Sequence, residues 1–237
     1  MHKLYRFSNS MGTVYNILIF VLMSNPSSLV MENEGKKDIN NTLNTIEART
    51  CYSNCNLEGK LDFEIFENAM KSLDEMEYSN EDIVSIIDYS KPSTEKRLFI
   101  LDLKKQELLY HTFVAHGKNT GVNMATKFSN NKGSNQSSLG VFRTGESYQG
   151  KHGYSLRLDG LEKGFNDNAR RRAVVMHSAS YVSEDFIERY GRLGRSWGCP
   201  AVPVEFSKEI IDLIKGGSCL YIYAIDINYL ENSILSD

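Results

Sequence analysis

Two residues of this chain have side chains and surroundings suited to thiol acyl transfer. Cys199 lies in the stretch GRSWGCP (residues 194–200), which is made of small and rigid residues. His177 ends the apolar run at residues 173–176. A thiolate is the nucleophile in such chemistry, and a nearby imidazole can generate it near neutral pH. The two residues therefore predict a cysteine nucleophile served by a histidine base.

The neighbours of Cys199 favour a reactive thiol. The alternative, a buried structural cysteine, is typical of apolar surroundings, whereas Ser196, Gly198 and Pro200 surround this one. Gly198 lets the backbone approach a ligand closely and leaves amide N–H groups free to face a developing oxyanion. Pro200 removes one donor and stiffens the exit of the turn. We therefore favour a nucleophile over a structural cysteine.

His177 needs an acceptor on its second ring nitrogen to fix its tautomer. The sequence marks no Asp or Asn partner, so the backbone carbonyl of Ser178 is the candidate. A hydrogen-bonded structural histidine is the alternative at such a strand end. The presence of Cys199 favours the base.

Four residues near these groups are candidates for binding substrate: Arg195, Ser196, Trp197 and Tyr154. The Arg195 guanidinium can bind a carboxylate in a bidentate manner, or a neighbouring loop instead. Trp197 can wall a groove beside Cys199. Tyr154 and Trp197 can equally belong to the core.

Three other histidines do not form a pattern typical of a metal site. His111, His116 and His152 lack the compact spacing of known zinc motifs, and a zinc site needs three or four converging ligands. We predict neither a metal nor another cofactor.

The composition is that of an ordinary globular protein. The 237 residues are 41% hydrophobic and 24% charged, with a formal net charge of -3. Without a basic excess we expect no nucleic-acid partner. The run Arg170-Arg171-Arg172 can hold an anion, but we favour a solvated strand edge or a salt-bridged cluster.

The first 24 residues predict a signal peptide or an N-terminal anchor. Lys3 and Arg6 precede an apolar stretch at residues 14–23, which is short for a membrane span and typical of a secretory signal. No clean cleavage site follows, and no later apolar run is long enough to span a membrane. We expect a periplasmic or cell-envelope protein.

The four cysteines leave their pairing open in an exported protein. Cys51 and Cys55 can pair or remain free, and Cys219 lies in an apolar run that predicts a buried thiol. A disulfide between Cys199 and Cys219 would remove the nucleophile.

The remaining patterns divide the chain into a linker, one domain and a tail. Residues 25–58 are polar and predict a linker, residues 59–228 the catalytic domain, and residues 229–237 a C-terminal tail. Many short strands with few helices predict a mainly β fold of the α+β class. The expected helices cover residues 61–73, 81–89, 182–190 and 204–214; the expected strands cover residues 97–103, 107–116, 139–144, 154–158, 173–177 and 219–225; a long polar segment covers residues 117–138.

The chain resembles the YkuD-type L,D-transpeptidases, in the branch of murein L,D-transpeptidase catalytic domains. Their signature is a histidine followed by a small residue, then S/T-x-G-C. Four blocks carry the resemblance in order: HGKNTG (116–121), SSLG (137–140), GYSLRLDG (153–160) and GRSWGCPA (194–201). The resemblance covers roughly residues 61–225.

The resemblance implies a mixed β-sandwich or barrel-like catalytic domain that acts on peptidoglycan stem peptides. It implies that Cys199 attacks the carbonyl of the third stem residue and expels the terminal D-alanine, with His177 as base and the Ser178 carbonyl as its orienting group. It also implies an oxyanion hole at the amides of Gly198 and Cys199. A side-chain amine of a second stem then resolves the thioester into a 3→3 cross-link. Water as acceptor would make the protein an L,D-carboxypeptidase, and a groove without turnover would make it a peptidoglycan-binding protein.

Two positions depart from the commoner family pattern. That pattern has histidine before the Gly-Cys pair and arginine or asparagine two residues after the cysteine, where this chain has Trp197 and Ala201. Arg195 is the candidate replacement. The segment at residues 117–138 is expected to be a lid or part of the groove.

Overall fold

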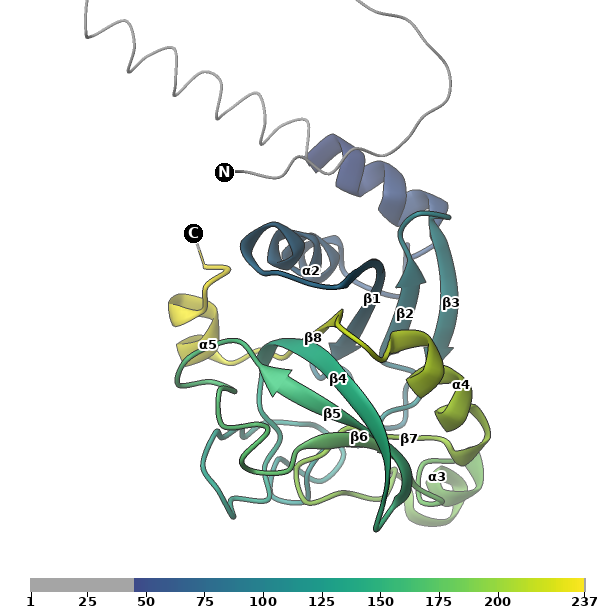
Figure 1. Ribbon diagram of the computed structural model, residues 1–237. Coiled ribbons are helices and arrows are strands. Elements are labelled where there is room, and N and C mark those ends of the chain that lie inside the picture. Colours follow the sequence, from purple (N-terminus) through teal and green to yellow (C-terminus); the bar gives the residue numbers. More distant parts are fainter. Residues whose placement is uncertain (1–44, 237) are drawn as a thin grey trace, which may run out of the picture.

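One eight-stranded sheet organises the chain, in the order β3-β2-β1-β8-β4-β5-β6-β7 (Figure 1). The computed structural model describes residues 45–236. The strands are β1 (Asn80–Asp88), β2 (Leu98–Asp102), β3 (Glu107–Thr112), β4 (Gly140–Gly150), β5 (Gly153–Gly160), β6 (Val175–Ser178), β7 (Ala201–Val202) and β8 (Ser218–Tyr223). The helices with defined bounds are α2 (Phe63–Glu75), α3 (Glu184–Tyr190), α4 (Val204–Ile214) and α5 (Ile227–Asn232).

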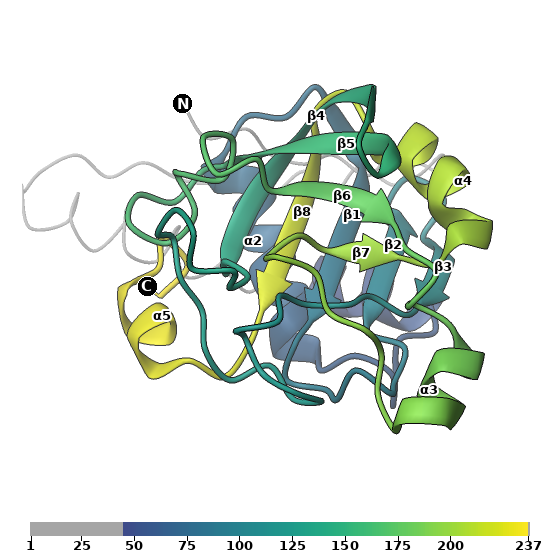
Figure 2. The same cartoon turned by 90° about the horizontal axis from the view of Figure 1, so that it is seen from below.

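The sheet curls until its two ends meet. β1 pairs with β8 and β6 with β7 in parallel, and the other neighbouring strands are antiparallel. Beyond β3, the Ala115 amide donates to the Ala201 carbonyl of β7 at 2.8 Å, which joins the two ends of the strand order (Figure 2). The result is a nearly closed barrel with few helices. The predicted mainly β, α+β fold is confirmed.

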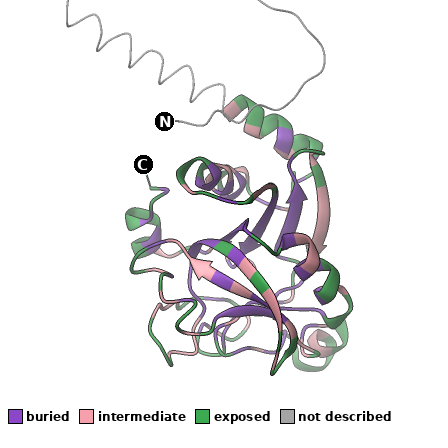
Figure 3. Cartoon of the chain, in the orientation of Figure 1, coloured by how far each residue is buried: buried purple, intermediate pink, exposed green. Residues whose placement is uncertain are grey.

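The core lies on the inner strands and under α2. All of β2 is buried, as is the second half of β1, because elements cover these strands on both faces (Figure 3). Helix α2 turns an apolar stripe with Ile65, Phe66, Ala69 and Leu73 toward the sheet and contacts β8 and β1. Helix α4 covers β1, β4, β5 and β6 on another side. The strands that lead to residues 177 and 201 are thus held in a packed sheet.

Most predicted elements are present, and one is wrong in type. The helix predicted at residues 204–214 has the bounds of α4, and the strands predicted at residues 97–103 and 107–116 are β2 and β3, which pair with each other. Residues 81–89 were predicted as a helix but form most of β1, where Ile83, Val84, Ile86 and Ile87 are buried between β2 and β8. A short apolar run does not distinguish a helix from a buried strand by periodicity alone.

The linker prediction is wrong for the part of it that the structure describes. Residues 45–54 are helical, and Cys51, Cys55 and Leu57 are buried in the core. The Tyr52 ring packs edge-on against Phe63 at a centroid distance of 5.4 Å. Residues 45–58 therefore belong to the domain. The predicted signal peptide or anchor and the rest of the linker lie outside the described residues.

The predicted C-terminal tail is also docked on the domain as far as the structure describes it. Helix α5 buries Tyr229, whose hydroxyl donates to Glu162 Oε1 at 3.0 Å. The Ile234 amide donates to the other carboxylate oxygen at 3.4 Å. Residues 229–236 thus complete the packing around a buried carboxylate. Among residues 45–236, no helix has the length and hydrophobicity needed to cross a membrane.

Candidate active site

The turn that carries Cys199 is braced by its own serine and by a neighbouring segment. Ser196 Oγ accepts from the Gly198 amide at 3.1 Å and donates to the Cys199 carbonyl at 2.6 Å. The Ser196 amide donates to the His116 carbonyl at 3.0 Å, and the Lys118 amide donates to the Ser196 carbonyl at 2.8 Å. These bonds fix the turn (residues 194–200) against the start of the 117–138 segment.

Gly198 is required by the close approach of another backbone. Its φ is +123°, and a Cβ on this residue would lie 2.7 Å from the Gln136 carbonyl oxygen. Ser137 Oγ donates to the Gly198 carbonyl at 3.2 Å and accepts from the Gly117 amide at 3.1 Å. The 117–138 segment therefore packs directly against the residue before the nucleophile.

The Cys199 sulfur lies beside the backbone that enters β6. The Val175 amide donates to Sγ at 3.4 Å, and the thiol donates to the Ala173 carbonyl at 3.7 Å. Ala173 has φ +54°, a left-handed conformation that is rare for a residue with a Cβ. Burial raises the pKa of the thiol, whereas the Val175 amide and the charge of Arg172 act to lower it. All four cysteines are free, so no disulfide joins Cys199 to Cys219.

His177 is held in one tautomer by the next peptide group. Its Nδ1–H donates to the Ser178 carbonyl at 2.9 Å, the contact that the resemblance implies. Because a carbonyl can only accept, the neutral ring carries its lone pair on Nε2. Burial lowers the pKa of His177 and outweighs the opposing effect of the Ser178 bond. The ring is therefore neutral near pH 7, with Nε2 able to take a proton.

The sheet register brings the two groups close together in space. His177 pairs with Ala201 across β6 and β7, and its amide donates to the Pro200 carbonyl at 3.3 Å. Within residues 45–236 no hydrogen bond joins the Cys199 thiol to the His177 ring, because the thiol donates to the Ala173 carbonyl. A rotation about the Cα–Cβ bond of Cys199 is the motion that would redirect the sulfur. Catalytic hydrogen bonds are often absent before substrate binds.

A second histidine lies on His177. The His152 ring, from the turn between β4 and β5, stacks on it at a centroid distance of 4.5 Å and an interplanar angle of 25°. The charge of His152 contributes to lowering the pKa of His177. Sequence reasoning considered His152 only as a zinc ligand and missed this contact, because nothing along the chain links residue 152 to residue 177.

The two predicted oxyanion donors differ in the structure. The Gly198 amide donates to Ser196 Oγ in this structure and would have to leave that bond to serve an oxyanion, so its assignment to the oxyanion hole stays a prediction. The Cys199 amide has no hydrogen-bond partner within residues 45–236. Both amides therefore stay candidate donors to an oxyanion, and the Cys199 amide is the one available without breaking a bond.

Three of the predicted substrate-binding residues sit in the Cys199 turn, with different outcomes. Ser196 is 5% exposed and its hydroxyl braces the turn, so this prediction is wrong. Arg195 donates to the carbonyls of Lys118 and Gly121 at 3.1 Å each, which makes it a contact to the neighbouring loop rather than a free anion binder. Trp197 is 72% exposed, with Lys118 Nζ 5.6 Å from its ring. Its predicted role stays a prediction.

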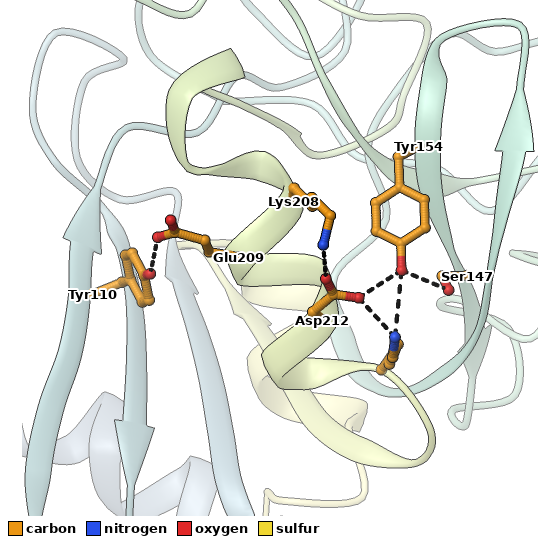
Figure 4. Close-up of polar contacts among 7 residues, drawn as sticks. Tyr110, Ser147, Tyr154, Lys208, Glu209 and Asp212 are labelled. Carbon is orange, nitrogen blue, oxygen red and sulfur yellow. Dashed lines mark hydrogen bonds and ion pairs between the residues drawn. The ribbon is translucent and has the colours of Figure 1, made fainter.

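Tyr154 lies on the wrong side of the sheet for the site. Its neighbour Ser155 is the partner of His177 across β5 and β6, so Ser155 and His177 share a face and Tyr154 points to the opposite one. There its hydroxyl donates to Asp212 Oδ1 of α4 at 2.6 Å and lies 2.9 Å from Ser147 Oγ (Figure 4). Its substrate-binding prediction is therefore wrong.

A model of the L,D-transpeptidase catalytic domain family matches residues 57–223. The chain belongs to this family. The match covers most of the chain, including all four sequence blocks and the Cys199 turn, and it confirms the family resemblance. L,D-transpeptidases are acyltransferase enzymes, so the chain carries a catalytic domain of that class.

No curated protein matches this L,D-transpeptidase domain significantly. Among solved structures, it is similar to an L,D-transpeptidase from Mycobacterium smegmatis, with a TM-score of 0.37, 13% identity and coverage of 60% of this chain and 59% of that one. It is also similar to the L,D-transpeptidase (residues 123–326) from Xylanimonas cellulosilytica, with a TM-score of 0.35, 15% identity and coverage of 61% of this chain and 62% of that one. A third similar structure is the L,D-transpeptidase from Stackebrandtia nassauensis, with a TM-score of 0.35, 14% identity and coverage of 74% of this chain and 75% of that one. The chain spans about three fifths of the length of the first two structures.

Proposed function

We propose that this protein is a peptidoglycan L,D-transpeptidase that forms 3→3 cross-links through a thioester on Cys199. The observation that carries the proposal is the hydrogen bond from His177 Nδ1 to the Ser178 carbonyl, which leaves Nε2 basic next to the strand that follows Cys199. A structural histidine would not need its second nitrogen free. Membership of the L,D-transpeptidase family supports peptidoglycan stem peptides as the substrate.

In the first half-reaction, His177 Nε2 takes the proton of the Cys199 thiol after the sulfur turns away from Ala173. The thiolate attacks the carbonyl carbon of the third stem residue, and the carbonyl electron pair moves to oxygen. The Cys199 amide donates to this oxyanion. The tetrahedral intermediate then collapses, the carbon–nitrogen bond breaks, and the departing D-alanine takes the proton from Nε2. The product is a thioester between Cys199 and the donor stem.

In the second half-reaction, a side-chain amine of another stem attacks the thioester carbonyl and gives a proton to His177. The carbon–sulfur bond breaks, and the thiolate recovers that proton. Each turnover exchanges one amide bond for another, so no cofactor or energy source is consumed. Water in place of the amine would release a shortened stem, which is the reaction of an L,D-carboxypeptidase.

A peptidoglycan substrate determines where the proposed enzyme acts. Peptidoglycan lies outside the cytoplasmic membrane, so the enzyme acts in the periplasm or cell envelope. The predicted signal peptide or anchor at residues 1–24 supports export.

The experiment incubates the purified protein with disaccharide-tetrapeptide and separates the products by liquid chromatography with mass spectrometry. The wild type is expected to release D-alanine and form cross-linked dimers, and Cys199→Ala is expected to form none. Cys219→Ala is the matched control, because Cys219 is buried away from the site and contacts Ser72. Dimers from the Cys199→Ala variant would overturn the mechanism.

The same experiment separates the alternatives. Tripeptide without dimers would identify a carboxypeptidase. Binding to sacculi without any product would identify a peptidoglycan-binding protein. A carbapenem adduct on the Cys199 peptide of the wild type, absent from Cys199→Ala, would establish a reactive thiol independently of the acceptor.

A further inference from the structure

The arginine run at residues 170–172 divides into residues with different partners. Arg170 is paired with two carboxylates, with Nη1 3.1 Å from Glu146 Oε1 and Nη2 2.9 Å from Asp159 Oδ2. Arg172 is half-buried, and among residues 45–236 it forms no ion pair. The prediction of a salt-bridged cluster thus holds for Arg170 and fails for Arg172.

The Arg172 guanidinium is held entirely by neutral oxygen atoms of the 117–138 segment. Nη1 donates to the Ser129 carbonyl at 2.7 Å and also to Ser138 Oγ. Nη2 donates to the Gln136 carbonyl at 2.7 Å and to Ser134 Oγ at 3.3 Å. Carbonyls and hydroxyls satisfy the N–H groups but do not cancel the positive charge. The group is therefore fixed in position and still carries a full charge.

This charge lies directly against the Cys199 turn. A Cβ on Gly198 would be 3.6 Å from Arg172 Nη2, and the Gln136 carbonyl that Nη2 contacts is the same atom that approaches Gly198. The guanidinium thus sits next to the residue that precedes the nucleophile. Its charge opposes the effect of burial on the pKa of the Cys199 thiol.

The other titratable groups that face Cys199 do not carry a permanent charge. Burial lowers the pKa of His177 on β6, and His152 stacks on that ring. Burial raises the pKa of Tyr89, after β1, to about 12, and it raises that of Tyr181, before α3, to about 12. Arg172 is the permanent charge among the groups that act on the sulfur.

We propose that Arg172 is a positioning residue that stabilises the Cys199 thiolate with its unpaired charge while holding residues 129–138 against the Gly198 turn. The inference rests on the proposed role of Cys199 as nucleophile. The Arg172 side chain would then both stabilise the thiolate electrostatically and hold the 117–138 segment against the Cys199 turn. Neither role was predicted from the sequence.

The test follows the alkylation of Cys199 by iodoacetamide as a function of pH, with the modified peptide quantified by mass spectrometry. The midpoint of the rate profile gives the apparent pKa of the thiol. In Arg172→Gln the midpoint should rise by about one unit, at the low end of the effect of an adjacent opposite charge. In Arg172→Lys it should rise less, because lysine keeps the positive charge. It should still rise, because an ammonium cannot bind the Ser129 and Gln136 carbonyls as the planar fork does. Arg170→Gln, two residues away and ion-paired elsewhere, should leave it unchanged.

Circular dichroism and thermal melting identify which variants fold. If Arg172→Gln does not fold, Arg172→Lys decides the question alone. A midpoint equal to that of the wild type in the folded Arg172 variants would overturn the proposal, as would an equal rise in Arg170→Gln. Because alkylation needs no peptidoglycan, a failure of the proposed transpeptidase activity would leave this result interpretable.

Discussion

His177 owes its chemical state to a single backbone acceptor and to its neighbours. The Ser178 carbonyl fixes the tautomer, burial keeps the ring neutral, and the stacked His152 adds a like charge when both rings are protonated. A side-chain acceptor such as a carboxylate would raise the pKa of the ring further than a carbonyl does. The arrangement therefore favours a base that is already unprotonated at neutral pH.

The pH dependence of acylation follows from this state. Activity requires neutral His177, so the rate falls on the acid side as the ring protonates, with a midpoint below the ordinary histidine pKa of about 6.5. His152→Ala removes a charge that lowers the pKa of His177, so the midpoint should move up by about half a unit. The measurement is the carbapenem acylation rate against pH, with His111→Ala on β3 as the control. If the midpoint of His152→Ala stayed at the wild-type value or fell, the stacked His152 ring would not lower the pKa of His177.

At the scale of elements, the Cys199 turn depends on the close approach of the 117–138 segment. Gly198 has no room for a Cβ, since the Gln136 carbonyl oxygen would be 2.7 Å away. Gly133 lies in the same segment with φ +80°, but nothing would lie within 4 Å of a Cβ there. An alanine at Gly133 would therefore introduce backbone strain alone, whereas an alanine at Gly198 would add a steric clash at the site.

Gly198→Ala should lower the rate of carbapenem acylation by about 100-fold, because a shift of about 1 Å at a nucleophile has that effect. Gly133→Ala should keep the rate within about 2-fold and lose only about 1–2 kcal/mol for the left-handed conformation. Stopped-flow acylation and thermal melting measure the two quantities. Equal acylation rates in both variants would show that the close contact does not position Cys199.

The sequence predicts those parts of the site that follow from residue type and local spacing. Cys199 and His177 stand out by their flanking residues, and the predicted bounds of α4 match the structure because its amphipathic period is regular. Arg172 and His152 could not be predicted, because the fold rather than local spacing brings Arg172 to the 117–138 segment and His152 to the His177 ring. Tyr154 was misassigned because adjacent strand residues point to opposite faces, and only the structure shows which face α4 covers.

At the scale of the whole molecule, both ends of the described chain are part of the packed domain. Residues 45–58 bury two cysteines, and α5 places the Tyr229 hydroxyl on the buried Glu162. Burial raises the pKa of Glu162, against the hydrogen bonds that lower it. The C-terminal helix is therefore attached through a polar contact as well as through apolar packing.

Tyr229→Phe should lower the free energy of unfolding by about 1–3 kcal/mol, since it leaves a buried carboxylate without one donor. Tyr190→Phe removes a hydroxyl from a side chain that is 60% exposed and should change the stability by less than about 0.5 kcal/mol. Urea denaturation at neutral pH measures both. An equal effect of the two substitutions would show that the Glu162 contact adds nothing to the docking of α5.

The central place of β8 has a consequence for how the protein is made. Among residues 45–236, β8 is the last strand in the sequence, yet it lies in the strand order between β3-β2-β1 and β4-β5-β6-β7. A ribosome-bound chain that has not released residues 218–223 lacks the strand that lies between these two halves of the sheet, and long-range pairing of this kind forms late. The thiol and the imidazole sit in one half and much of their support in the other. We therefore expect the site to form only after residues 218–223 have joined the sheet.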